Sequence, residues 1–137
     1  MNQLFELHDS RIAISWFDYG SAIIIFSHAY IHRSEGEPGR DSGTGWSQRA
    51  ELVIGEDTQI DLPRAWPCSI YYGSLELNDV VYENEIPIPL AHEGSVRFKL
   101  EIADDDDNPM SVEFIGKNAN LTLLGEAHYV DEFPGVG

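Results

Sequence analysis

Three residue types that cooperate in hydrolases stand side by side near the start of the chain, as His8-Asp9-Ser10. A nucleophilic serine needs a base and an orienting acid that converge on it in space. Neighbouring side chains of a strand point to opposite faces, so three adjacent residues cannot form this relay. The sequence also lacks a Gly-x-Ser-x-Gly elbow. We therefore predict no catalytic residue, and we expect the triplet to shape the entry to the first strand, with Asp9 or Ser10 bonding to local backbone.

His28 and His32 are a second pair that could do chemistry, as metal ligands. On a strand they would lie on one face but roughly 13 Å apart, which is too far to share a metal ion. A helix would bring them together, but the β-branched run Ile23-Ile24-Ile25 argues against one. We expect no metal and no cofactor, and a strand whose end emerges into solvent.

The run Asp104-Asp105-Asp106-Asp107 offers hard oxygen ligands of the kind that Ca²⁺ prefers. It lacks the central glycine and the distant bidentate glutamate of an EF-hand loop. A solvated loop that discourages edge-to-edge association is the simpler interpretation. Together with Glu101, these four acids are also our candidates for a partner-binding acidic loop.

Charge is the most unusual property of the whole sequence. Twenty-four acids against eight bases give a net charge of −16. Residues 1–68 carry a net −5 and residues 69–137 a net −11. Such a field repels nucleic acid and anionic membranes and favours basic proteins, although solubility alone would also explain it.

Aromatic residues suggest a different kind of site. Trp46, Tyr71 and Tyr72 could form a platform for a small ligand, a carbohydrate or a peptide. Most aromatic side chains of an all-β protein belong to its core. Trp46 follows a glycine-rich loop, so we expect it to be exposed.

The elements that must position these residues follow from a period-two pattern of apolar side chains. Ile12, Ile14 and Trp16 alternate with polar or small residues, and residues 48–54 and 96–102 alternate in the same way. No stretch has a helical apolar stripe, apart from one possible short turn near Leu62–Trp66. The pattern predicts an all-β fold with little or no helix: an antiparallel β-sandwich, or a partly open barrel, of about 8–10 strands.

Turn residues divide these strands. Asp18–Ser21 and Asn78-Asp79 predict tight hairpins. Gly116-Lys117-Asn118 predicts a further turn, which would make residues 96–124 a three-stranded meander with Val96, Phe98, Leu100, Val112, Phe114, Leu121 and Leu123 facing the core. Residues 33–45 read as a long mobile loop, and the prolines of Glu85–Leu90 place that segment at a sheet edge.

The length and the cysteine content set the class of protein. The 137 residues fit a single domain, residues 1–137, and Cys68 is the only cysteine, so no intrachain disulfide can form. The N-terminus has neither a basic start nor an apolar run of signal length, and the longest apolar run, Ala22 to Phe26, is too short to span a bilayer. A soluble cytoplasmic protein is the expected class.

Both ends of the chain resemble known sequences. The opening Leu7-His8-Asp9-Ser10 resembles a start found in small uncharacterised bacterial proteins, some of them encoded near toxin systems. The closing residues 125–135, which contain Glu132-Phe133-Pro134-Gly135, look like the end of an all-β family of unknown function. The resemblance implies a bacterial cytoplasmic protein with an interaction role and carries over no catalytic residue.

Two functions remain open from the sequence. The first is a non-enzymatic, immunity-type or regulatory protein that presents its acidic surface to a basic protein partner. The second is a β module that binds a small ligand or carbohydrate in an aromatic-lined cleft. An enzyme is a third interpretation, for which no convergent set of nucleophile, base and oxyanion donors can be found in the sequence. A deep apolar pocket with a carboxylate or histidine of perturbed pKa would favour the second or the third, and a flat acidic surface without a pocket would favour the first.

Overall fold

The structure is a computed structural model that describes residues 1–56 and 65–136. They form one antiparallel sheet of eight strands, and no helix is found among them. The strands are β1 (Asn2–Asp18), β2 (Ser21–Ser34), β3 (Gly43–Gly55), β4 (Cys68–Leu77), β5 (Val80–Glu83), β6 (Glu85–Ile88), β7 (Ala91–Asp104) and β8 (Pro109–Phe133). The predicted all-β class is confirmed. The short helical turn predicted near Leu62–Trp66 falls largely outside the described residues.

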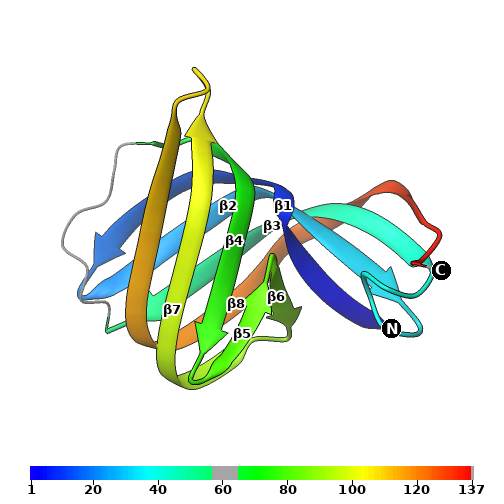
Figure 1. The fold of residues 1–137 in the computed structure, drawn as a ribbon, viewed down its shortest axis with the longest axis horizontal. Coiled ribbons are helices and arrows are strands. Elements are labelled where there is room, and N and C mark those ends of the chain that lie inside the picture. Colours follow the sequence, from blue (N-terminus) through cyan, green and yellow to red (C-terminus); the bar gives the residue numbers. More distant parts are fainter. Residues whose placement is uncertain (57–64, 137) are drawn as a thin grey trace.

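The sheet curls until its two sides meet. The strand order is β5-β4-β7-β8-β3-β2-β1-β6, and β4 pairs in addition with β1 through Arg11↔Ser69 and Ile12↔Cys68. Six strands thus form a ring, with β5 and β6 outside it (Figure 1). Of the two predicted architectures, this ring is nearer to a partly open barrel than to two stacked sheets.

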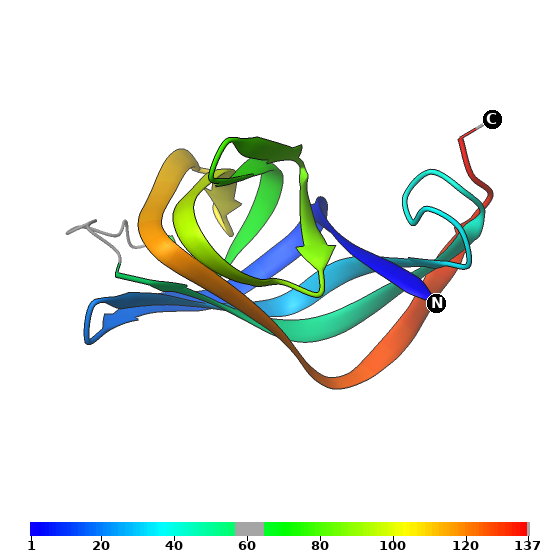
Figure 2. The ribbon, with the colours of Figure 1, turned by 90° about the horizontal axis from the view of Figure 1, so that it is seen from below.

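Four of the strands continue beyond the ring. Their ends form a four-stranded extension, made of residues 2–6 of β1, 30–34 of β2, 43–47 of β3 and 128–133 of β8. The extension carries both chain termini, as Figures 1 and 2 show. Register shifts interrupt the pairing of these strands where they leave the ring: between Glu6 and Arg11, between Phe26 and Ala29, and between Gly45 and Arg49. Because bulges bend strands, they create a corner between ring and extension.

The core fills the ring and is dominated by aliphatic and phenylalanine side chains. Phe98 and Phe114 are fully buried, with ring centroids 6.1 Å apart. The predicted inward facing of Val96, Phe98, Leu100, Val112 and Phe114 is confirmed, while Leu121 and Leu123 pack partly buried against the core.

The predicted meander of residues 96–124 is wrong in its last turn. Gly116-Lys117-Asn118 lies inside β8, which runs without a break from Pro109 to Phe133. The strand is long because its two parts have different neighbours: residues 109–120 pair with β7, and residues 118–133 pair with β3. The polar triplet lies where the second neighbour begins to pair, at the start of this overlap, and it looks like a turn without being one.

The first predicted alternation also changes phase. Ile12 is buried, but Ile14 and Trp16 are 48% and 41% exposed, because the register shifts between Ile12 and Ile14. Such a shift moves every following side chain to the other face.

The hairpins at residues 18–21 and 78–79 are confirmed, as is the edge position of β6. The loop predicted over residues 33–45 is shorter, since β2 continues to Ser34 and β3 begins at Gly43.

Candidate functional site

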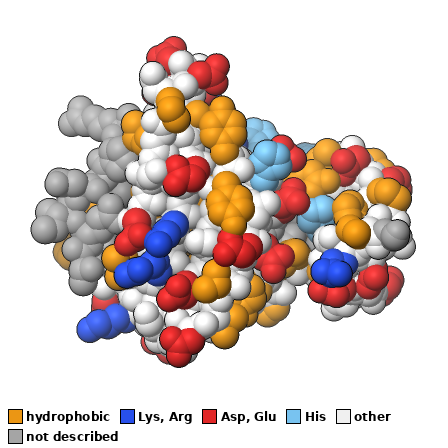
Figure 3. Space-filling view, viewed as in Figure 1, with side chains coloured by type: hydrophobic (Ala, Val, Ile, Leu, Met, Phe, Trp, Pro, Cys, Tyr) orange, Lys and Arg blue, Asp and Glu red, His pale blue; other side chains and the backbone are white. Residues whose placement is uncertain are grey.

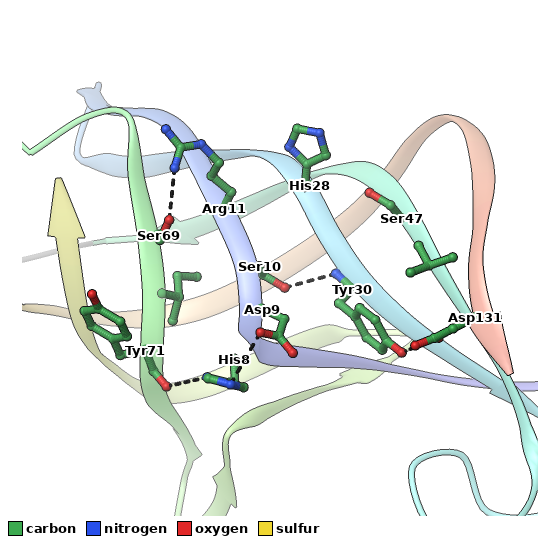
Figure 4. Close-up of a pocket in the computed structure, with 12 residues that line it drawn as sticks. His8, Asp9, Ser10, Arg11, His28, Tyr30, Ser47, Ser69, Tyr71 and Asp131 are labelled. Atoms are coloured by element: carbon green, nitrogen blue, oxygen red, sulfur yellow. Dashed lines mark hydrogen bonds and ion pairs between the residues drawn. The ribbon is translucent and has the colours of Figure 1, made fainter. Parts of the chain in front are cut away.

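A groove of about 720 Å³ lies at the corner between the ring and the extension. Five strands supply its walls, and Figure 4 shows the side chains that line it. The lining consists of His8, Asp9, Ser10 and Arg11 from β1; His28 and Tyr30 from β2; Ser47 from β3; Ser69, Ile70 and Tyr71 from β4; and Val130 and Asp131 from β8.

The floor of the groove is the β1 bulge that contains the His8-Asp9-Ser10 triplet. The Ser10 hydroxyl donates to the Glu6 carbonyl at 2.6 Å and accepts from the Tyr30 amide at 3.0 Å, which closes the gap in the ladder. Asp9 has a φ of 70°, a left-handed conformation that Asp tolerates better than most residues. The predicted bonding of Ser10 to local backbone is therefore correct. The triplet does not form the strand entry, however, because pairing already begins at Asn2.

Asn84, between β5 and β6, fixes this bulge from the side. Its backbone carbonyl accepts from the Leu7 amide, and its side-chain oxygen accepts from the His8 amide, both at 2.9 Å. Its own amide donates to the Gly73 carbonyl at 2.7 Å, so the bulge is tied to β4. The His8 ring adds a further link, with Nδ1 3.0 Å from the Tyr71 carbonyl.

Tyr30 and Asp131 form the polar centre of the groove. The Tyr30 hydroxyl donates to Asp131 Oδ1 at 2.7 Å. Gly45 lies beside this pair, and a Cβ there would collide with the ends of both side chains. The pKa of Tyr30 is raised by burial, then by the hydrogen bond to Asp131 and by the charges of Asp131, Glu6 and Asp9. Three carboxylates therefore act on one neutral phenol.

Arg11 is the one guanidinium among the described residues that line the groove, and it is already paired. It donates to the Ser69 hydroxyl at 2.9 Å and forms an ion pair with Asp105. Its positive charge is consequently compensated by the Asp104–Asp107 loop rather than by the carboxylates of the groove.

The two histidines of β2 differ in environment. His28 is exposed and lines the groove, with Nδ1 3.2 Å from the Ser27 hydroxyl. His32 is 5% exposed, so the predicted emergence of this strand end into solvent is wrong. Tyr30 and Phe133 cover it, with ring centroids 4.9 and 5.0 Å from the imidazole.

Of the three predicted aromatic site residues, the structure brings one into the groove. Tyr71 lines it and is 53% exposed. Tyr72 does not line it, and its hydroxyl bonds instead to Glu83. Trp46 is not the exposed residue that we expected: it is partly buried in the extension, 5.6 Å from the Tyr129 ring, with the Arg33 guanidinium 4.4 Å above it.

The predicted acidic loop connects β7 to β8, and much of its charge has a structural role. Asp104 accepts from the amides of Asp106 and Asn108 at 2.9 Å, and these bonds with the Asn108 side chain lower the Asp104 pKa. Asp105 pairs with Arg11, while Asp106 and Asp107 are exposed. Glu101 accepts from the Ser111 hydroxyl at 2.6 Å. Of these five acids, Asp105 alone reaches a residue of the groove.

The sequence pattern predicted no role for Tyr30 and only a local role for Asp9. Asp131 was a candidate only as one of the acids of a possible recognition face, near the C-terminus, and not as a partner of Tyr30. Their convergence depends on the bulges, which no local pattern shows.

Among the residues that the structure describes, no cluster of three or more His, Cys, Asp or Glu side chains is arranged to hold a metal ion. Burial raises the pKa of the Cys68 thiol to about 12, so this cysteine is not a nucleophile at neutral pH.

The described part of the chain contains no helix long and apolar enough to cross a membrane. Comparisons with protein-family models, curated proteins and solved structures find no match.

Proposed function

We propose that this chain is a non-enzymatic binding protein whose groove takes a cationic side chain of a basic protein partner, as an immunity-type or regulatory factor would. The observation that carries the proposal is that the carboxylates of Asp9 and Asp131 both line the groove, with Asp131 hydrogen-bonded to the Tyr30 hydroxyl at its centre. Because Arg11 is already paired with Asp105, no guanidinium among the described residues of the groove neutralises these carboxylates. An incoming ammonium or guanidinium group supplies the missing charge.

The rest of the groove suits the same ligand. The Tyr30 and Tyr71 side chains line it and provide aromatic surface for the alkyl part or the charge of a basic side chain. The net charge of −16 steers a basic protein toward the molecule from a distance. Figure 3 shows acidic side chains spread over this face, with basic side chains among them both over the ring and on the extension. A local site in the groove therefore explains recognition better than a continuous acidic face.

The proposal includes a cytoplasmic setting. Cys68 is the only cysteine, and it is buried and unpaired, which fits a reducing compartment.

A second candidate function is the binding of a small polar ligand or a carbohydrate. The volume of the groove favours it, since about 720 Å³ falls within the range of small-molecule sites. The Tyr71 wall would serve as the stacking surface for a sugar ring.

A titration followed by NMR tests the first function against the second. The probe is a short blocked Gly/Ser peptide with one central lysine, and its control carries glutamine instead. We expect the lysine peptide alone to shift the amide signals of residues 8–11, 28–30 and 130–131. Asp131→Asn should weaken binding roughly fivefold, which corresponds to about 1 kcal/mol, the size of one exposed charge pair. Asp9→Asn should act similarly, because Asn also tolerates the left-handed conformation at position 9.

Asp79→Asn is the matched control, since it removes the same charge from an exposed hairpin turn. If Asp79→Asn weakens binding as much as Asp131→Asn does, the attraction belongs to the net charge and the groove has no special role. Equal shifts with the glutamine peptide would also contradict the proposal. Saturable binding of methyl glycosides in place of the lysine peptide would favour the second function.

A further inference from the structure

The outer edge of the extension is the part of β8 that follows its pairing with β7. The β7–β8 ladder ends at Ala91↔Asn120, after which the Leu121 amide still donates to the Leu90 carbonyl at 3.0 Å. Beyond this point β8 continues to Phe133 with β3 as its one neighbour among the described strands. Figures 1 and 2 show β8 as the outermost strand of the extension. This side of β8 is therefore a row of backbone donors and acceptors with which a further strand can pair.

Two irregularities limit how much of this edge can receive a strand. Residues 125–127 stand opposite the single residue Gln48, which bends the strand away from a regular ladder. Residues 128–133 pair with residues 43–47 of β3 and contain one extra residue, Val130. Val130 and its neighbour Asp131 also line the groove. We call residues 128–133 the open edge, and a strand added there would run along one wall of the groove.

Asp131 and Glu132 present their carboxylates on opposite faces of the open edge. They are consecutive and pair with the consecutive residues Gly45 and Thr44 of β3, and successive side chains of a strand alternate between faces. Asp131 points to the face of the groove, where it accepts the 2.7 Å hydrogen bond from the Tyr30 hydroxyl. Glu132 therefore belongs to the face turned away from the groove.

Tyr129 accompanies Glu132 on that second face. It pairs with Trp46, whose indole N–H donates to the Thr44 hydroxyl at 2.7 Å, so these two β3 residues share the face of Glu132. The Tyr129 hydroxyl donates to Glu132 Oε1 at 3.0 Å. Tyr129 is 53% exposed and thus accessible to a neighbouring side chain. Each face of the open edge consequently carries one tyrosine–carboxylate pair.

The charge of the open edge selects its occupant. Residues 126–132 contain three acids, Glu126, Asp131 and Glu132, and no Lys or Arg. No Lys or Arg of the described residues forms an ion pair with Asp131 or Glu132. A second copy pairing along the same edge would bring these acids close to their equivalents, and like charges on paired strands are destabilising. A basic segment supplies the complementary charge.

We infer that the open edge of β8 receives an extended segment of the basic partner as an added strand, and that two consecutive basic residues of this segment reach Asp131 on one face and Glu132 on the other. Consecutive side chains of a strand point to opposite faces, so one enters the groove and the next contacts the Tyr129–Glu132 pair. Main-chain hydrogen bonds supply affinity, and the side chains supply specificity. This inference rests on the proposed function of the groove and defines the class of segment that it recognises.

Backbone methylation of a peptide tests the strand addition. The probe is a blocked seven-residue Ser/Thr peptide with two consecutive central lysines, and two versions carry N-methyl groups on alternate residues, one on the even and one on the odd positions. The amides of a strand point alternately to its two sides, so only one version loses the donors that face β8. We expect that version to bind at least about tenfold more weakly and the other to keep its affinity, since two or three hydrogen bonds are lost. Amide exchange of residues 128–133 should slow when the unmethylated peptide binds.

The spacing of the lysines tests the use of both faces. A peptide with lysines at i and i+2 has the same net charge but presents both on one face. We expect the consecutive pair to bind about fivefold more tightly, the effect of one exposed charge pair. Glu132→Gln should abolish this preference and leave the single-lysine peptide unaffected, whereas the control Glu93→Gln, at an exposed position of β7, should leave the preference intact.

The outcomes separate this inference from the proposed function. Equal binding of the two methylated versions, with the single-lysine peptide still sensitive to Asp131→Asn, would overturn the added strand and keep the groove. If none of the peptides binds, both ideas fail. A preference for consecutive lysines that survives Glu132→Gln, or no such preference, would overturn the use of the second face. A free protein that sediments as a dimer with the amides of residues 128–133 protected would assign the open edge to a second copy and overturn the inference.

Discussion

Gly45→Ala should disturb the centre of the groove more than any other single methyl group added there. A Cβ at position 45 would fall inside van der Waals contact with Asp131 Oδ1 and the Tyr30 hydroxyl, and would lie 2.8 Å from Tyr30 Cζ. Both side chains must move, so the 2.7 Å hydrogen bond between them breaks. A hydrogen bond to a charged group contributes about 1.5–3 kcal/mol, and exposure of Asp131 to solvent reduces this to about 1 kcal/mol.

For a domain of this size, a loss of about 1 kcal/mol lowers the melting temperature by roughly 3–5 °C. The assay is thermal unfolding followed by circular dichroism, together with NMR titration of ¹³C-labelled tyrosine. In Gly45→Ala the pKa of Tyr30 should fall toward the ordinary value of tyrosine, because its hydrogen bond to Asp131 is one of the causes that raise it. The fully exposed Tyr19 provides the reference signal.

A double-mutant cycle with Tyr30→Phe isolates the hydrogen bond. Phenylalanine removes the hydroxyl but keeps the ring. In the Tyr30→Phe background the added methyl group still collides with the ring, but there is no longer a hydrogen bond for it to break. Gly45→Ala should therefore cost about 1 kcal/mol less in the Tyr30→Phe background than in the wild type. Equal costs in both backgrounds, with an unchanged Tyr30 titration, would refute the role of Gly45 in seating this pair.

Two further predictions concern stability. Phe98→Ala and Phe114→Ala should each lower the free energy of unfolding by about 3–5 kcal/mol in denaturant titrations, because both rings are fully buried, and an unchanged midpoint for either would contradict that packing. Asp104 and Glu85 should contribute to stability with opposite dependence on pH. The lowered pKa of Asp104 means that its contribution is present above its ordinary value of 3.8 and is lost as the pH falls, so the cost of Asp104→Ala should shrink on acidification. The raised pKa of Glu85 means that stability is lost as the pH rises above its ordinary value of 4.5, so Glu85→Gln should stabilise the protein at neutral pH but not at pH 3. A cost of Asp104→Ala that grows on acidification, or a stabilisation by Glu85→Gln that appears at pH 3 and not at neutral pH, would contradict these assignments.

The fold was predictable wherever side-chain alternation persists along a strand. Residues 96–102 alternate cleanly, and β7 buries the side chains that the pattern selects. Prediction failed where pairing rather than local sequence decides. The bulge after Ile12 turned Ile14 and Trp16 outward, and the change of neighbours along β8 hid the continuity of the strand behind Gly116-Lys117-Asn118.

The candidate site was less accessible to prediction for the same reason. Asp9 and Asp131 are more than 120 positions apart, and only the β1–β2–β3–β8 order of the sheet brings them to one groove. Tyr71 was named because exposed aromatic residues are a general feature of binding surfaces. Tyr30 offered no such signal, since its importance comes from the carboxylates around it.

The closing contact of the ring has a mechanical consequence. Within the described residues, the backbone ladder between β1 and β4 consists only of Arg11↔Ser69 and Ile12↔Cys68, whereas the other neighbours in the ring pair along most of their length. This seam is the part of the ring whose separation breaks the fewest hydrogen bonds, so it is where local opening requires the least free energy. The same seam holds Ser69 and Tyr71 of one groove wall against Arg11 of the other. The width of the groove is therefore set by the junction with the shortest ladder in the ring, and the amides of residues 11–12 and 68–69 should exchange with deuterium before those of the remaining ring.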